Sequence, residues 1–290
     1  MMVTEEQTTR ASVIPPVTDS YQLSIEADRP NAQYWRDLIR YRELFMFLAW
    51  RDILVRYKQT VIGIAWAVVR PLLTMIIFTF VFARLAKVQS EHAPYPILVM
   101  CGLLPWQLFA NALTEASGSL IANSNLVTKV YFPRMIMPAA AIAVAVVDFF
   151  IAFGLLLGMF AVYGFMPSGK ILLLPAFLTL AILCSLGAGL LITALNVRFR
   201  DVRYIIPFIV QLGLYISPVG IPSDIVPANW RMLYSLNPMV GVIDGFRWCI
   251  IDGTELYLPG LLISIAVTIA VMITGVRYFR STERTFADLI

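Results

Sequence analysis

The segment GFMPSGKI, residues 164–171, has a spacing that could bind nucleotide, because it contains the G-x-x-x-x-G-K core of a phosphate-binding loop. Ile171 follows the lysine, at the position where a Ser or Thr hydroxyl would hold magnesium. The segment also follows a long apolar run instead of a buried strand. We therefore interpret it as a turn between two membrane helices.

The remaining candidates for catalysis or metal binding are few. His92 is the single histidine of the chain. Neither the cysteines nor the acidic residues of the predicted outer segments have the spacing of a disulfide framework or of a metal site. They are Cys101, Cys184, Cys249, Asp224, Asp244, Asp252 and Glu255. An enzyme acting on lipid-linked sugars would carry an acidic metal-binding cluster or a histidine base. The sequence therefore predicts no catalytic residue, no metal site and no cofactor bound by this chain.

Arg70 and Asp148 are the charged residues that lie deepest within apolar runs. An arginine near the middle of a membrane span costs about 2.5–3.5 kcal/mol on insertion scales, so an intramembrane ion is a candidate for function. Pro71 follows Arg70 and can bend the helix there. Three interpretations stay open: Arg70 contacts the substrate, forms a salt bridge with Asp148, or extends its side chain toward the membrane surface.

These residues belong to a chain that is too apolar for one soluble domain. Its 290 residues are 59% hydrophobic and 14% charged, with a mean hydropathy of +0.78, which is more apolar surface than one core of that size buries. Runs of about 20 apolar residues predict membrane-spanning helices. We predict an all-α membrane protein with six transmembrane helices per subunit, at residues 61–83, 95–113, 136–163, 171–195, 204–221 and 257–278.

The positive charge of the predicted loops orients these spans. With the N-terminus in the cytoplasm, the cytoplasmic segments contain 16 Lys and Arg residues and the opposite segments contain 5. Cytoplasmic loops of membrane proteins carry such an excess. The sequence therefore predicts a multi-pass protein with both termini in the cytoplasm.

The first 60 residues divide into two parts. Residues 1–33 are polar and contain proline, which predicts a flexible cytoplasmic tail. Residues 34–60 have helical periodicity, with a basic side opposite an apolar one. The apolar side consists of Trp35, Ile39, Met46, Trp50, Ile53 and Tyr57. This pattern predicts an amphipathic helix on the membrane surface, followed by a six-span transmembrane domain at residues 61–290.

Two polar segments lie between predicted spans. NVRFRDVRY, residues 196–204, holds three arginines and an aspartate. The arginines orient the hairpin, whereas acidic residues contribute little to orientation, so Asp201 either caps the following helix or meets a cationic partner. SLIANSNLVTKVYFPRMIMP, residues 119–138, is too polar to span yet has an apolar side. It predicts a short amphipathic helix that ends near Pro133.

Residues 217–255 are broken by four prolines and are still rich in aromatic side chains. Such a stretch can form short helices that dip into the outer leaflet, provided that the broken backbone is buried in protein or lines a cavity. The alternative interpretation is an aromatic belt at the outer membrane surface.

Small residues four apart occur twice within the predicted spans, as GLLLG at residues 154–158 and as SLGAG at residues 185–189. This spacing lets helix backbones approach closely in a membrane. We therefore expect tight helix packing at both segments.

Three motifs together carry a family resemblance: LIANSNLVTKVYFPRMIMP, NVRFRDVRYIIPFIVQLGLYISPV and LYSLNPMVGVIDGFRW, in this order and at these separations. Over about residues 34–280, the chain resembles the permease subunit of type-2 ABC exporters of O-antigen, capsule and teichoic acid. The resemblance implies a homodimer of six-span subunits in the bacterial inner membrane, paired with two copies of a nucleotide-binding ATPase that holds ATP and magnesium. It also implies a lipid-linked glycan as cargo, and we expect no nucleic acid among the partners.

The candidate site residues form three groups. The resemblance places a coupling helix between spans two and three and sets residues 198–204 near the ATPase, so the coupling candidates are Leu120, Asn123, Asn125, Lys129, Tyr131, Phe132, Pro133, Arg134, Arg198, Arg200 and Asp201. A path for sugar rings and phosphates needs aromatic, amide and cationic side chains, and the candidates are Trp66, Arg70, Trp106, Gln211 and Tyr215. The family has re-entrant periplasmic gate helices where this chain has residues 217–255, and the candidates there are Trp230, Tyr234, Phe246 and Trp248.

The sequence favours export of a lipid-linked polysaccharide, with O-antigen as the first choice. Aromatic side chains suited to sugar rings and the amphipathic N-terminal helix favour this cargo. The alternatives are a permease for capsular polysaccharide, teichoic acid, a small lipid or a drug and, in another class, a membrane-embedded enzyme such as a lipid-linked sugar transferase.

Overall fold

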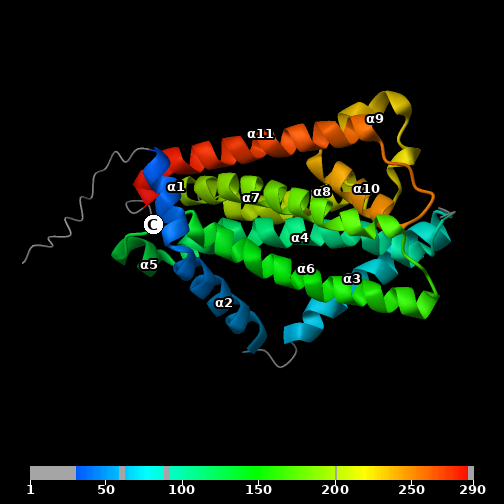
Figure 1. Cartoon of the computed structure of the whole chain (residues 1–290), viewed down its shortest axis with the longest axis horizontal. Coiled ribbons are helices and arrows are strands. Elements are labelled where there is room, and N and C mark those ends of the chain that lie inside the picture. The colour runs from blue at the N-terminus through cyan, green and yellow to red at the C-terminus, as the bar shows by residue number, and fades with distance from the viewer. Residues whose placement is uncertain (1–30, 59–62, 88–91, 200, 287–290) are drawn as a thin grey trace, which may run out of the picture.

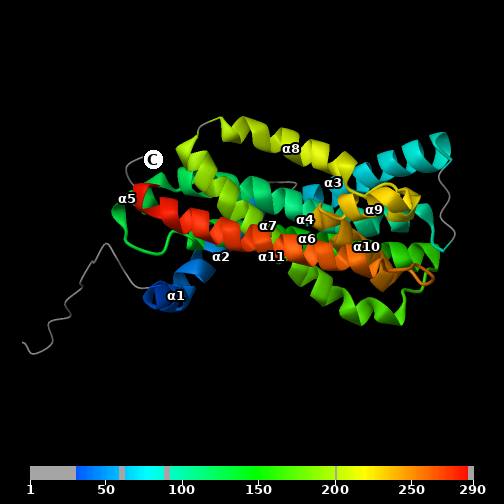
Figure 2. The same cartoon turned by 90° about the horizontal axis from the view of Figure 1, so that it is seen from above.

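The computed structural model describes residues 31–58, 63–87, 92–199 and 201–286. Every regular element in these ranges is a helix, and the helices form one elongated bundle (Figures 1 and 2). The all-α fold class is confirmed. Five helical segments are long and apolar enough to cross a membrane: Ala65–Leu85, Tyr95–Ala122, Ile136–Tyr163, Gly169–Arg198 and Leu258–Thr285.

These segments are built mainly from five α-helices, with short helical turns at three of their ends. The α-helices are α3 (Gly63–Phe78), α4 (Tyr95–Ala122), α6 (Ile136–Tyr163), α7 (Leu174–Arg198) and α11 (Leu258–Thr282). The turns are η1 (Thr79–Leu85) after α3, η2 (Gly169–Leu173) before α7 and η4 (Glu283–Thr285) after α11.

The predicted third span coincides with α6, which ends where Gly164 adopts a left-handed conformation at φ 61°. The second predicted span is too short, because α4 continues through the polar residues 114–122 to Ala122. In that stretch the hydroxyls of Thr114 and Ser117 donate to helix carbonyls three or four residues earlier. A hydropathy window misses such a helix because its polar groups are satisfied locally.

The predicted fifth span, residues 204–221, corresponds to α8 (Val202–Ile216), an apolar helix of 15 residues. It ends because Ser217 is extended, with ψ 151°, and the following Pro218 cannot continue a helix. The helix is therefore shorter than the predicted span, and among the described residues it falls outside the five segments that meet the length of a membrane crossing.

The predicted amphipathic helix at residues 34–60 is two helices, α1 (Asn31–Arg40) and α2 (Arg42–Lys58), separated at Tyr41. Its predicted apolar side does not face one environment. The side chains of Trp35 and Trp50 are exposed, whereas the Tyr57 hydroxyl turns inward and donates to Asp148 of α6. The one helix predicted here is therefore two, with α2 packed against α6, and its place on the membrane surface stays a prediction.

The proline-broken region after α8 does contain short helices, as predicted. They are η3 (Ser223–Ile225), α9 (Ala228–Tyr234) and α10 (Pro238–Ile250). Asn237 caps α10 by accepting a hydrogen bond from the Met239 backbone N–H at 3.1 Å, and Pro238 occupies the first turn, where its missing N–H costs nothing.

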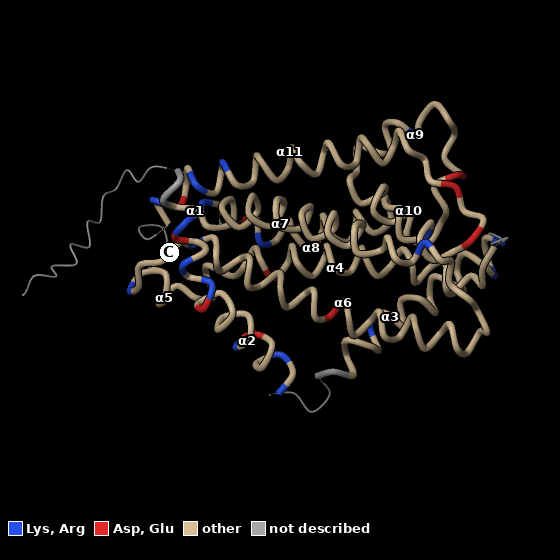
Figure 3. Tube along the Cα trace, viewed as in Figure 1, with Lys and Arg blue, Asp and Glu red and all other residues tan. Residues whose placement is uncertain are grey.

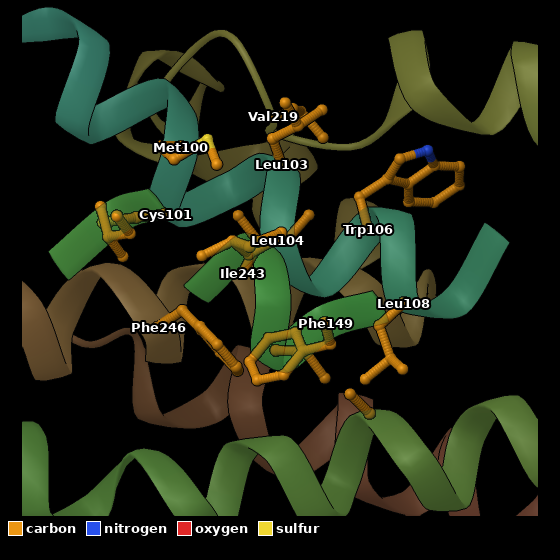
Figure 4. Close-up of a cluster of buried hydrophobic side chains, with 14 of the residues drawn as sticks. Met100, Cys101, Leu103, Leu104, Trp106, Leu108, Phe149, Val219, Ile243 and Phe246 are labelled. Carbon is orange, nitrogen blue, oxygen red and sulfur yellow. The ribbon is translucent and has the colours of Figure 1, made fainter. Parts of the chain in front are cut away.

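The main apolar core follows α4, which packs against α6, α7 and α10. Figure 4 shows Phe149 of α6 beside Phe246 of α10; their rings are 6.0 Å apart and nearly perpendicular, a favourable edge-to-face geometry. A second, smaller core joins α2, the end of α4, α5 (Ser124–Lys129), α7 and the C-terminal turn of α11 through Leu48, Leu120, Val127, Leu190 and Phe279.

The loops gather at two opposite ends of the bundle (Figures 1 and 2). One end, called the α5 end, holds α1, α5, the turn between α7 and α8, and η4. The other, called the α10 end, holds the turn before α7 together with α9 and α10. Basic residues concentrate toward the α5 end (Figure 3), so the segments that were predicted to be cytoplasmic share one end.

Candidate functional site

The predicted coupling segment begins within α4 and continues as α5. Asn123 separates the two helices and ties them to α2, because its Oδ1 accepts a hydrogen bond from Arg51 Nη2 at 2.8 Å. The predicted short helix is confirmed, although it ends before the expected stop near Pro133.

The candidate coupling residues of this segment divide between surface and core. Asn125, Lys129 and Tyr131 are exposed. Leu120 and Phe132 are buried in the smaller core, and Pro133 is also buried. The exposed residues can therefore contact another protein, while the buried ones hold α5 in place.

Arg134 joins the end of this segment to η4. Its backbone N–H donates to Glu283 Oε1 at 2.7 Å, and its guanidinium donates to the Glu283 carbonyl. The Arg280 guanidinium lies 4.5 Å from the centre of the Tyr34 ring. Burial, reinforced by the charge of Glu283, raises the pKa of the Tyr34 phenol. The coupling segment, α1 and η4 thus form one packed unit.

The second candidate strip forms the turn between α7 and α8, with Arg200 outside the described residues. Asn196 is buried and donates to the Ser117 carbonyl of α4 at 2.7 Å, while Arg198 is exposed. Asp201 occupies the N-cap position of α8, but its side chain accepts no capping hydrogen bond. The capping interpretation of Asp201 was therefore wrong, and its carboxylate is exposed.

Two of the five substrate-path candidates share a cleft of about 360 Å³ between α2, α3, α4 and α6. Trp66 and Arg70 line it, together with Gln107 and Asn111 of α4. The cleft is open at the surface, since Trp66 is 54% exposed.

Asp148 lies in the same cleft, but its ion pair is with Arg56 of α2, at 2.9 Å between Nη2 and Oδ2. The predicted alternative of a salt bridge between Arg70 and Asp148 was wrong, because α2 brings a different arginine to the carboxylate. Sequence reasoning missed Arg56, since it lies in a helix expected to rest on the membrane surface.

The other three path candidates lie elsewhere. Trp106 is buried and packs on Gly213 of α8, where an added Cβ would lie 2.5 Å from the indole ring. Gln211 and Tyr215 are exposed on α8, and Tyr215 lines a separate pocket beside Phe78 and Phe82.

The four gate candidates differ in burial. Trp230 of α9 is exposed, whereas Phe246 is fully buried and belongs to the main core. Trp248 is half-buried, with the Lys170 ammonium 5.1 Å from its ring centre. Tyr234 lines a polar pocket of about 660 Å³ at the α10 end.

Asp244 and Arg247 are two of the five Asp, Glu and Arg residues that line this pocket, and sequence reasoning gave them no role. Arg247 is buried and donates to the carbonyls of Val219 and Ile221 at 2.8 and 3.3 Å. The Ser223 hydroxyl donates to Asp244 Oδ1 at 2.6 Å. Burial raises the pKa of the Asp244 carboxyl although Arg247 opposes the change, and burial lowers the pKa of Arg247. The signal in the sequence was two charges within the apolar run MVGVIDGFRW.

The phosphate-loop-like segment is a turn, as interpreted from the sequence. Ser168 caps η2 and donates to Asp252 Oδ1 at 2.7 Å, and the turn leads from one long helix into the next. Within the described ranges, no group of three His, Cys, Asp or Glu side chains is arranged to hold a metal ion.

Comparison with known proteins gives this helical arrangement a family. A family model described as ABC-2 type transporter matches residues 43–251. The O-antigen export system permease protein RfbA of Klebsiella pneumoniae is 27% identical over 256 residues, which are 86% of this chain and 95% of the relative. RfbA of Myxococcus xanthus is 26% identical over 258 residues, covering 88% and 98%. The polysialic acid transport protein KpsM of Escherichia coli is 20% identical over 234 residues, covering 80% and 91%.

The matched range begins in α2 and runs to the residue after α10. It therefore includes α5 and the turn between α7 and α8, where the coupling candidates lie, and all four gate candidates. The chain therefore belongs to the ABC-2 type transporter family.

Proposed function

We propose that this chain is the transmembrane subunit of an ATP-driven exporter that moves a lipid-linked polysaccharide, in the first place O-antigen, across the bacterial inner membrane. The observation that carries the proposal is similarity over most of both chains to two O-antigen export permeases, at 27% and 26% identity. The polysialic acid transport protein is less similar, at 20%, which makes a capsular polysaccharide the second candidate cargo.

In this proposal α8 acts as a sixth span, with the α5 end in the cytoplasm. The 15 residues of α8 rise roughly 22 Å. The loop after α8 is held against α10, because Arg247 donates to the carbonyls of Val219 and Ile221. The excess of basic residues toward the α5 end supports this orientation by the positive-inside rule (Figure 3). Helices α9 and α10 would then be the re-entrant elements of the periplasmic gate.

The proposed assembly contains two copies of this chain and two ATPase subunits, which bind the ATP and magnesium. Support for self-association comes from α3 and α8, two apolar helices with few buried residues. Ile206 is the buried residue of α8, while Leu73 and Ile77 of α3 are exposed. Two copies that pair through these helices would cover apolar surface and could enclose a path for the glycan.

In this proposal the ATPase binds a surface formed by the exposed coupling residues. Lys129 and Tyr131 of the α5 segment and Asp201 of the α7–α8 turn all lie at the α5 end. Since the core that includes Phe132 fixes α5 to the bundle, motion of an ATPase bound there would reach the spans.

Co-purification tests this proposal. The chain would be expressed with the genes that neighbour it and purified in mild detergent. We expect a nucleotide-binding ATPase to co-elute in equal amount, and its ATP hydrolysis to rise when lipid-linked glycan is added. Elution of the chain alone, with no ATPase gene nearby, would contradict the proposal and favour an enzyme or a passive channel.

Asp201→Ala is expected to weaken coupling while membrane insertion stays normal. Loss of one exposed carboxylate that faces a cationic partner should lower glycan-stimulated ATP hydrolysis and export by roughly two- to fivefold, the range for one surface ion pair. A charge reversal at Arg200 tests the same strip. Asp224→Ala, an exposed aspartate of η3 in the pocket at the α10 end, is the matched control. Equal ATPase stimulation and export in wild type and Asp201→Ala would refute the role.

A further inference from the structure

The cleft between α2, α3, α4 and α6 is lined by more arginines than carboxylates. Arg56 and Arg70 both line it, together with a single carboxylate, Asp148. That carboxylate pairs with Arg56 at 2.9 Å and also accepts a hydrogen bond from Tyr57. Arg56 also pairs with Glu115 at 3.2 Å, so both of these carboxylates are bound to Arg56. Within the described part of the chain, Arg70 forms no ion pair.

Neutral hydrogen-bonding groups face the same space. Gln107 and Asn111 lie four residues apart on α4, hence on one side of that helix, and both line the cleft. Among the described residues, neither side-chain amide has a hydrogen-bond partner. A ligand with several acceptor oxygens would satisfy these amides and the guanidinium of Arg70 together.

The surface of α3 beside Arg70 is polar at one end and apolar at the other. Trp66, Arg70, Leu73 and Ile77 follow one another at spacings of four, three and four residues, which places them on one helix face. All four are exposed. This order matches an amphiphile, with an anionic group at Arg70 and a hydrocarbon chain along Leu73 and Ile77.

We propose that this cleft binds the phosphate group of a membrane lipid, with Arg70 as its counter-ion and Gln107 and Asn111 as donors. An arginine within an apolar segment is costly unless an anion accompanies it, and within the described part of the chain the carboxylate that could serve is already paired with Arg56. A phosphate ester offers the charge and the several acceptor oxygens that these three side chains can bind.

Two lipid sources share this chemistry: the polyprenyl phosphate carrier of the cargo, and an ordinary anionic phospholipid of the membrane. The polyprenyl source rests on the proposed function, whereas the phospholipid source does not. Binding is measured on the full chain without an ATPase. Failure of the lipid site is therefore distinguishable from failure of the exporter assignment, which co-purification tests.

The experiment is native mass spectrometry of the purified full chain, titrated with phosphatidylglycerol and with a polyprenyl phosphate. We expect Arg70→Gln to weaken binding of the preferred lipid at least about tenfold, as for the loss of a charge-assisted hydrogen bond. Arg70→Lys keeps the charge and should stay within about threefold of wild type. Arg84→Gln, an exposed arginine at the other end of the same helical segment, is the matched control and should bind as wild type does.

The two probes identify the source. Displacement of phosphatidylglycerol by an equal concentration of polyprenyl phosphate would assign the site to the cargo carrier. Retention of phosphatidylglycerol would assign it to a membrane phospholipid. The site is refuted if Arg70→Gln binds both probes as tightly as wild type, or if Arg84→Gln loses binding to the same extent.

Discussion

Gly275→Ala is expected to lower the free energy of unfolding by about 3 kcal/mol or more and the Tm by roughly 6–12 °C. Gly275 of α11 lies against Gly187 of α7, and a Cβ added to Gly275 would lie 2.1 Å from the Gly187 carbonyl oxygen. Because the obstacle is backbone, no rotamer change relieves the clash. The two helices would have to separate along their length, which exposes the contacts between α7 and α11.

The measurement is thermal unfolding in detergent, followed by loss of monodisperse protein. Gly158→Ala is the matched control, since an added Cβ at Gly158 of α6 meets nothing within 4 Å and Ala is the better helix former. Gly187→Ala should behave as Gly275→Ala does, because its Cβ would lie 2.6 Å from the Met272 backbone. A Gly275→Ala protein as stable as the Gly158→Ala protein would show that the two helices do not cross at these glycines.

Arg247→Met is expected to destabilise the α10 end by about 2–4 kcal/mol, because the loop carbonyls of Val219 and Ile221 would lose their donor while remaining in a crowded site. The same change should accelerate amide hydrogen exchange across residues 217–222, since the guanidinium holds two carbonyls of this loop against α10. Export should fall with it, because the loop joins α8 to the elements at that end.

Hydrogen exchange read by mass spectrometry, together with thermal unfolding, checks the expectation for Arg247→Met. Arg231→Gln is the control. Arg231 also donates to backbone carbonyls, those of Val226 and Asp224, but it is only half-buried, so water can replace it. Equal exchange at residues 217–222 in wild type and Arg247→Met would contradict the fastening role.

Hydropathy predicted best those helices whose ends are set by the residues next to them in the sequence. The apolar run of α6 ends at Gly164, whose left-handed conformation stops the helix, and both features can be read from the sequence. The extension of α4 to Ala122 was not readable in this way, because its Ser and Thr hydroxyls bond to the helix itself.

Contacts between elements were harder to predict than the elements. The small-residue segment at 185–189 does lie at a helix crossing, through Gly187, whereas Gly154 and Gly158 have nothing within 4 Å of an added Cβ. Within the described chain, residues 154–158 therefore form no close helix crossing through their glycines. Spacing alone does not say which face of a helix meets a neighbour, and the same limit explains why Arg56 was missed as the partner of Asp148.

The packing of Arg134, Glu283 and Tyr34 has a mechanical consequence. Helix α1 and η4 come from opposite ends of the described chain, yet both are fastened to the segment after α5. A displacement of α5 would therefore move α1 and η4 together with it. A fluorophore placed on either α1 or η4 should then respond to a partner that binds α5 with the same timing as one placed on α5.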